Sequence, residues 1–307
     1  MSQPTLVNLP ASVLHRLQNL RLARGVDFNS LLSAFVMERF LYRLSVSPHA
    51  QRFVLKGAML LAVWAPLEHR STYDLDLLGF GDNSAQALLR AFTEICEVPV
   101  VPDGLAFDAT TLRLLDIQRQ GEYLGRRVRL VGRLGKARVP LQVDVGFGDA
   151  VVPPPLEVEY PTLLDFPAPR LRAYPREAVV AEKLQAMVQF GQTNGRLKDY
   201  HDIWTLSQRW DFQGALLSQS IRATFGRRNV PIPPEVPFGL SAAFAELPEK
   251  TAQWAGFLRK ARLEANPRHL GEVIDCLQRF LMPVLQALVE GHDLEARWPP
   301  GGPWAPG

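Results

Sequence analysis

Lysine and cysteine are both scarce in this chain of 307 residues, and each scarcity is informative. The two cysteines, Cys96 and Cys276, lie far apart and match neither a disulfide framework nor the short spacing of a metal-binding motif. Both are therefore expected to be free thiols in the core. Nearly all basic residues are arginines, so a lysine that remains inside a motif, such as Lys56 or Lys183, merits attention.

Long apolar segments are also missing. No run approaches the roughly 18 residues of a membrane span, and the N-terminus lacks the charged and apolar regions of a signal peptide. We therefore expect a cytoplasmic protein with no membrane partner. The net charge of +3 is compatible with an RNA or nucleotide partner without requiring one. A hydrophobic content of 47% supports a sizeable core and excludes wholesale disorder.

Apolar periodicity divides the first half of the chain into helices followed by strands. Helices are predicted over residues 10–24, 30–44 and 84–96, and the second begins at a cap formed by Asp27 or Asn29. In this second helix, Glu38, Arg39 and Arg43 either face a partner or pack internally, and packing is favoured. Strand-like runs separated by glycine turns predict antiparallel hairpins over residues 106–107, 110–118, 126–134 and 139–147.

Proline content suggests where the domains divide. We assign residues 1–160 to N-terminal helices and a catalytic core, and residues 161–175 to a proline-rich connection. Residues 176–297 read as a helical domain, and residues 298–307, rich in proline and glycine, as a disordered tail.

Residues 53–79 carry the strongest chemical signal. Asp74 and Asp76 lie two positions apart among apolar residues, so in a strand both carboxylates point to the same face. Close like charges repel unless a cation lies between them, which suggests a divalent metal such as Mg²⁺ carrying a phosphate substrate. Taken alone, the pair also fits two solvated acids on an edge strand.

A third acid occurs in a similar setting. In the run 139–147, Leu141, Val143 and Val145 fall on one face, whereas Gln142 and Asp144 fall on the other. Acids are rarely buried without partners. Three carboxylates on two strands form the ligand set of a two-metal phosphoryl-transfer site.

The second half contributes a lysine and further acids. Lys183 lies close to the apolar stripe of a predicted helix over residues 176–190, and Asp199 and Asp202 lie near the start of the next helix. Helix-dipole stabilisation explains Asp199 but not the dense grouping around it, which includes Lys198. Three other groups have bland interpretations: His201 as a helix-surface residue, Asp149 as a turn residue, and Arg227-Arg228 as solvated surface rather than an RNA contact.

With these residues, the chain resembles the AbiEii/AbiGii nucleotidyltransferase toxins of type IV toxin–antitoxin systems, in the DNA polymerase β-like superfamily. The resemblance rests on segments 38–44, 53–58, 70–76, 143–149, 181–184 and 196–202, in this order and spacing. It implies an α+β fold, in which a polymerase β-like mixed sheet with flanking helices is followed by a mainly helical C-terminal domain that completes the active site.

The resemblance also implies roles for single residues. Asp74, Asp76 and Asp144 would bind metal, and Asp202 would act as a base or an orienting group. The residues expected at the nucleotide are Lys56, Gly57, Ala58, Arg70, Ser71, Thr72, Lys183 and Lys198. Ala58 departs from the pattern because many relatives have serine there, which leaves Ser71 or Thr72 as hydroxyl sources. Arg70 either binds phosphate or pairs with the acids.

The implied activity is Mg²⁺-dependent transfer of NMP from an NTP to an acceptor hydroxyl. By resemblance, the acceptor is the 3′ end of tRNA, the effect is blocked translation, and the partner is a cognate antitoxin encoded nearby. Two alternatives stay open from sequence alone. One is a toxin of the same fold that phosphorylates or nucleotidylates a protein, and the other is a non-catalytic nucleotide-binding scaffold.

Overall fold

The structure, a computed structural model, describes residues 8–64, 72–119, 122–261, 263, 267 and 269–307. The chain forms two compact units. The sheet unit comprises Met1–Gly148 and Leu156–Ala173, and the helical unit comprises Asp149–Pro155 and Tyr174–Gly307. Each unit is described by itself.

A seven-stranded mixed sheet forms the centre of the sheet unit, in the order β3-β4-β5-β2-β1-β7-β6. Its strands are β1 (Phe53–Lys56), β2 (Asp74–Gly79), β3 (Leu105–Arg119), β4 (Glu122–Leu134), β5 (Ala137–Phe147), β6 (Leu156–Glu159) and β7 (Arg170–Ala173). The pairs β2–β5 and β1–β7 are parallel, and the other neighbours are antiparallel. The expected β3–β4–β5 hairpins are confirmed.

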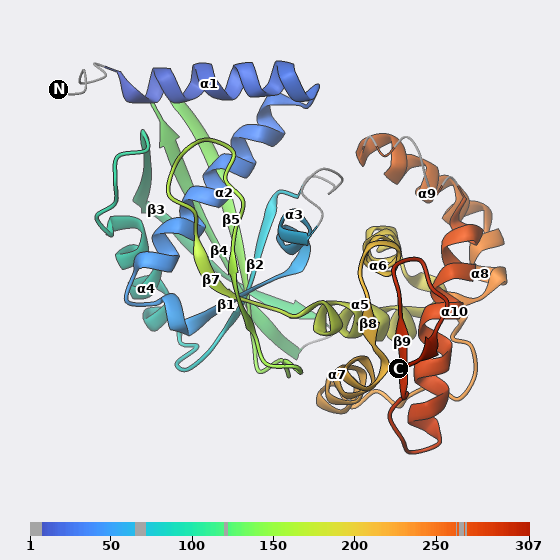
Figure 1. The fold of residues 1–307 in the computed structure, drawn as a ribbon. Coiled ribbons are helices and arrows are strands. Elements are labelled where there is room, and N and C mark those ends of the chain that lie inside the picture. Colours follow the sequence, from blue (N-terminus) through green and yellow to red (C-terminus); the bar gives the residue numbers. More distant parts are fainter. Residues whose placement is uncertain (1–7, 65–71, 120–121, 262, 264–266, 268) are drawn as a thin grey trace. The chain divides into compact units, whose positions relative to one another are not determined.

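Helices accompany the strands in this unit. They include α1 (Leu9–Arg24), α2 (Phe28–Val46), α3 (Leu60–Trp64) and α4 (Ala85–Glu97). Helix α2 begins at Asp27, whose carboxylate accepts a hydrogen bond from the Ser30 amide. Figure 1 shows α2 lying across the strands, and Val36 of α2 packs beside Gly132 of β4. Because strand side chains alternate, the opposite face carries the polar residues of β2 and β5.

The charged residues of α2 are buried and hold the chain segment before β7. Glu38 accepts a hydrogen bond from the Leu163 amide, and Arg39 donates one to the Pro167 carbonyl. Arg43 pairs bidentately with Asp103. The packing interpretation of these residues is therefore confirmed. Burial raises the pKa of Glu38 to about 7, against the opposing attraction of Arg39.

The proline-rich stretch is thus not a simple connection. Residues 156–173 add β6 and β7 to the sheet unit, whereas residues 149–155 group with the helical unit. This division differs from the expected boundary after residue 160, because main-chain pairing with β1 and contacts with α2 hold the segment that its proline content suggested was free.

The helical unit contains α5 (Arg176–Phe190), α6 (Leu197–Arg209), α7 (Gly214–Arg227), α8 (Ala242–Glu246), α9 (Pro248–Ala261) and α10 (Leu270–Val289). A small sheet joins β8 (Phe212–Gln213), β9 (Ala296–Trp298) and β10 (Ala305–Pro306). Within the described residues, no helix has the length and apolar character to cross a membrane. Cys96 and Cys276 are free and buried, as expected.

Two local expectations in this unit differ from the structure. Residues 298–307 pack on the helical unit instead of forming the expected disordered tail. Trp298 is buried, and Trp304 stacks on Phe280 with ring centroids 5.8 Å apart. His201 is buried, not on the helix surface, and contacts the rings of Trp204, Trp254 and Phe257. In both cases aromatic packing outweighs the local polarity of the sequence.

Candidate active site

A row of four charged side chains crosses the open face of the sheet. In the strand register, Lys56 of β1 is the partner of Asp76 of β2, Asp76 is the partner of Asp144 of β5, and Asp144 is the partner of Arg127 of β4. Register partners project from the same face. The order across the sheet is therefore cation, acid, acid, cation.

A second row lies two residues along the strands. Asp74 is the register partner of Gln142, and the Gln142 side-chain amide donates a hydrogen bond to Asp74 Oδ1 at 2.7 Å. Gln142 is in turn the partner of Arg129 on β4. Asp74 and Asp76 thus lie on one face, as the alternation in the sequence predicts, and parallel pairing brings Asp144 beside them.

Arg127 binds Asp144 with both arms of its guanidinium group. Nε lies 2.8 Å from Oδ1, and Nη2 lies 2.7 Å from Oδ2. These hydrogen bonds, together with attraction from Asp144, Asp74 and Asp76, raise the pKa of Arg127. Arg127 therefore responds electrostatically to all three acids while contacting one of them.

Gly57 makes the turn beside the acids sterically possible. It has φ of +73°, and a Cβ atom built on it would lie 2.1 Å from Asp76 Oδ2. Only glycine permits both this backbone conformation and this close approach. Gly57 opens a short 3₁₀ turn, η2 (Gly57–Met59), in which the side chain of Ala58 is buried.

The donor set suits a hard divalent cation. Asp74 and Asp76 present carboxylate oxygens on one face, and Asp144 adds a third from the adjacent strand. Among the described residues, however, no group of three or more acidic, histidine or cysteine side chains is already gathered around a metal position. Both Asp144 oxygens accept hydrogen bonds from Arg127, and Asp74 accepts one from Gln142.

Of the remaining residues predicted at the nucleotide, one contacts the main chain of Asp74, one lies in the helical unit, and two lie outside the described residues. Thr72 donates its hydroxyl to the Asp74 carbonyl oxygen at 3.2 Å. Arg70 and Ser71 lie outside the described residues. Lys198, in the helical unit, is exposed and forms no hydrogen bond or ion pair with any residue that the structure describes.

In the helical unit, the predicted lysine meets two acids. Lys183 Nζ on α5 lies 2.5 Å from Asp199 Oδ1 and 2.9 Å from Asp202 Oδ2, both on α6. All three side chains are largely buried, and Asp202 is fully buried. Asp199, which the sequence explained as a dipole-stabilising acid, is thus also a partner of the lysine.

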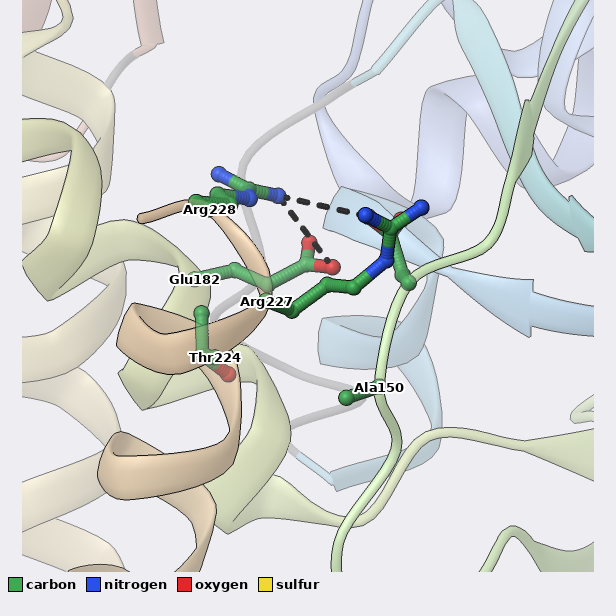
Figure 2. Close-up of a pocket in the computed structure, with 6 residues that line it drawn as sticks. Ala150, Glu182, Thr224, Arg227 and Arg228 are labelled. Carbon is green, nitrogen blue, oxygen red and sulfur yellow. Dashed lines mark ion pairs between the residues drawn. The ribbon is translucent and has the colours of Figure 1, made fainter. Parts of the chain in front are cut away.

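A small pocket in the same unit is lined mainly by charged side chains, some of which form ion pairs with one another. Its lining comprises Asp149, Ala150, Glu182, Thr224, Arg227 and Arg228. The Arg228 guanidinium group forms ion pairs with Asp149 and with Glu182, each at 3.6 Å (Figure 2). Asp149 is therefore more than the turn residue expected, and Arg228 more than solvated surface, because these side chains neutralise one another.

The residues that sequence reasoning overlooked are Arg127 and Gln142. The signal for Arg127 was present. A two-residue turn at Gly135-Lys136 pairs Leu134 with Ala137, and continuing outward by equal steps pairs Arg127 with Asp144. Gln142 was placed on the correct face, but its bond to Asp74 depends on the parallel β2–β5 pairing.

The described part of the site thus consists of a glycine turn, paired aspartates on the next strand and a third aspartate on the adjacent parallel strand. A family model described as "Nucleotidyl transferase AbiEii toxin, Type IV TA system" matches residues 39–279, and the chain belongs to this family. The protein is thus a nucleotidyltransferase toxin, and membership implies NTP as substrate and an antitoxin as partner.

Two solved Helicobacter pylori structures are similar to this chain. One, described as a candidate nucleotidyltransferase, is 14% identical with a TM-score of 0.47, and the match covers 86% of this chain and 95% of that chain. The other, JHP933, is 15% identical with a TM-score of 0.46, and the match covers 86% and 92%. No curated protein matches the sequence.

Proposed function

We propose that this toxin transfers NMP from an NTP to a hydroxyl group at the 3′ end of an RNA, with tRNA as the acceptor, in a Mg²⁺-dependent reaction. The observation that carries the proposal is the placement of Asp74, Asp76 and Asp144 on one face of adjacent strands. Asp74 and Asp76 would hold Mg²⁺, with Asp144 as the third carboxylate. When bound, Mg²⁺ would neutralise charge on the triphosphate.

The chain's own residues would then position the reactants. The backbone amides around Gly57 and Ala58 would cradle phosphate oxygens, which compensates for the missing serine hydroxyl. Lys56 lies at the start of this turn and would add a positive charge. Asp144 would accept a hydrogen bond from the acceptor hydroxyl and aim it at the α-phosphate, and pyrophosphate would leave.

We assign Lys183 to the triphosphate by family resemblance and Asp202 to the orientation of Lys183. Complete burial of Asp202 and its contact with Lys183 Nζ support an orienting group rather than a base. Asp199 would share this task. A base needs access to the proton that it removes, which a fully buried carboxylate bound to a lysine lacks.

Charge on the open face supports RNA as the acceptor. Arg113, Arg129 and Arg138 occupy β3, β4 and β5 on the face that carries the acids, and all three are exposed. None forms an ion pair with a carboxylate of the described residues. A basic surface beside a metal site suits a polyanion, because arginines bind phosphates without regard to base sequence.

A transfer assay tests the proposal. Purified protein incubated with each α-labelled NTP, Mg²⁺ and total RNA should label RNA in the tRNA size range. Asp76→Asn should abolish labelling, and blocking the RNA 3′ hydroxyl by periodate oxidation should abolish it also. Label on RNA that survives both changes would contradict the proposal.

Mass spectrometry of a co-expressed antitoxin separates RNA from protein acceptors. We expect the antitoxin, co-expressed with the toxin and analysed by mass spectrometry, to carry no nucleotide or phosphate. A modified serine, threonine or tyrosine that disappears in the Asp76→Asn variant, with unmodified tRNA ends, would favour the protein-modifying alternative. In cells, growth arrest by the wild-type toxin but not by Asp76→Asn would exclude a non-catalytic scaffold.

A further inference from the structure

Arg127 is a described charged residue that contacts one of the three acids and that the reaction, as described so far, does not use. It lies on β4, on the far side of Asp144 from Asp76, so that Asp144 stands between a cation and another acid in the strand register. Its side chain is one-third exposed and that of Asp144 one-fifth. The pair therefore lies at the edge of the site, accessible to solvent.

The bidentate geometry restricts Asp144 in two ways. The planar guanidinium group fixes the plane of the carboxylate, and it occupies one hydrogen-bonding position on each oxygen. It also neutralises one of three acids that otherwise repel each other. A metal ion that binds Asp144 therefore shares these oxygens with Arg127 and is repelled by its positive charge.

We propose that Arg127 is a positioning residue that orients Asp144 and, through its positive charge, sets the affinity of the site for divalent cations. This inference rests on the proposed metal site at Asp74, Asp76 and Asp144. Two properties of arginine contribute separately: the positive charge limits cation affinity, and the planar fork aims the third carboxylate at the acceptor hydroxyl.

Mn²⁺ binding to the nucleotide-free protein, followed by the electron paramagnetic resonance signal of free Mn²⁺, tests the charge. Arg127→Ala is expected to bind Mn²⁺ about tenfold more tightly, the effect of removing one unit charge a few ångströms from a divalent cation near the surface. Arg133→Ala is the matched control. Arg133 projects from the same face of β4 but pairs with Asp108, and its removal should change Mn²⁺ affinity by less than about twofold.

Arg127→Lys separates charge from orientation. Lysine keeps the positive charge but lacks the planar fork, so Mn²⁺ affinity should stay within about twofold of wild type. NMP transfer by this variant should fall about tenfold in kcat with an unchanged KM for NTP. A purely structural role for Arg127 would instead lower the Tm of both variants, which thermal unfolding measures, without raising Mn²⁺ affinity.

A double-mutant cycle shows whether Arg127 acts through Asp144. In the Asp144→Asn background, the effect of Arg127→Ala on Mn²⁺ affinity should shrink to below about threefold. Two results would overturn the role of Arg127: an equal effect of Arg127→Ala in both backgrounds, or Mn²⁺ binding by Arg127→Ala that is unchanged or weaker. If Asp76→Ala still abolishes Mn²⁺ binding in those experiments, the metal site itself stands. Wild-type protein that shows no Asp76-dependent Mn²⁺ binding would instead overturn the metal site on which both proposals rest.

Discussion

The two acid clusters of this toxin use carboxylates in opposite ways. In the sheet unit, Asp74 is exposed, Asp76 and Asp144 are half-buried, and the neighbouring cations are distributed along a row. In the helical unit, Asp199 and Asp202 are buried and share Lys183 at 2.5 Å and 2.9 Å, and Asp199 also lies 3.8 Å from Arg196. The first cluster is partly exposed, whereas the second is a buried ion-pair network.

This difference has a physical consequence. A buried charge needs its partner, because the cost of desolvation falls on whichever ion is left behind. A partly exposed carboxylate retains water and can exchange partners at low cost. We therefore expect substitutions in the sheet cluster to affect activity more than stability, and substitutions in the helical cluster to affect both.

The largest effect is expected for Asp76→Ala. Loss of a metal ligand should lower NMP transfer by on the order of 10³-fold or more, since a bound metal supplies several kcal/mol of transition-state stabilisation. The Tm should stay near that of wild type, because removing one acid also removes its repulsion with the neighbouring acids. Transfer assays and thermal unfolding measure the two quantities.

Asp116→Ala is the matched control for this change. Asp116 lies in the same sheet but pairs with Arg126, on the other face from Arg127. Its loss should leave NMP transfer within about twofold of wild type. A comparable loss of transfer in both variants would remove the distinction between the two faces.

Lys183→Ala should strongly destabilise the helical unit. Removing the lysine takes a cation at 2.5 Å and 2.9 Å from two buried carboxylates and leaves Asp199 with the longer contact to Arg196 at 3.8 Å. Breaking a buried pair in this way costs about 3–5 kcal/mol. Chemical denaturation measures the free energy of unfolding. Lys198→Ala is the control, because Lys198 is an exposed lysine of α6. This substitution should change the free energy of unfolding by no more than about 0.5 kcal/mol. Equal stability of the two variants would show that the ion pairs of Lys183 with Asp199 and Asp202 do not stabilise the unit.

Glu38 is another buried carboxylate and tests the effect of burial on ionisation. Its folded-state pKa of about 7 lies above the ordinary value of 4.5. The folded state therefore binds more protons between these values, so the stability from this group is fully present below pH 4.5 and is lost as pH rises through 7.

Glu38→Gln should remove this dependence. The free energy of unfolding of the variant relative to wild type should rise by up to about 3 kcal/mol between pH 4.5 and pH 8. Urea unfolding at several pH values measures the difference. Parallel pH profiles for the two proteins would mean that Glu38 keeps its charge in the fold.

Gly57→Ala should have a modest effect on stability and tests the space that the sheet cluster requires beside Asp76. A side chain at φ of +73° costs about 1–2 kcal/mol, and the added Cβ would also displace Asp76. Gly81→Ala is the control because Gly81 has φ of +79° but no neighbouring atom within 4 Å. Both variants should lose stability, but NMP transfer should fall only in Gly57→Ala. Retained transfer would show that Asp76 tolerates the shift.

Much of the fold follows from local patterns in the sequence. The helices over α1, α2, α4 and α5 and the strands β3 to β5 match the predicted segments closely, because periodicity within one element reflects which face is buried. The same alternation placed Asp74 and Asp76 on one face and Asp144 on the polar face of its strand. Segments 156–173 and 298–307 were harder, since proline and glycine content conceals pairing with distant strands and aromatic side chains.

The acids, the lysine and the glycine turn are evident in the local sequence, which also contains the pairing of Arg127 with Asp144. That pairing follows from a two-residue turn, and short hairpins set their own register. The parallel pairing of β2 with β5, which places Asp76 opposite Asp144, is visible only in the folded chain. Parallel strands meet through long connections, so their register depends on the whole core that buries them, and no local spacing encodes it.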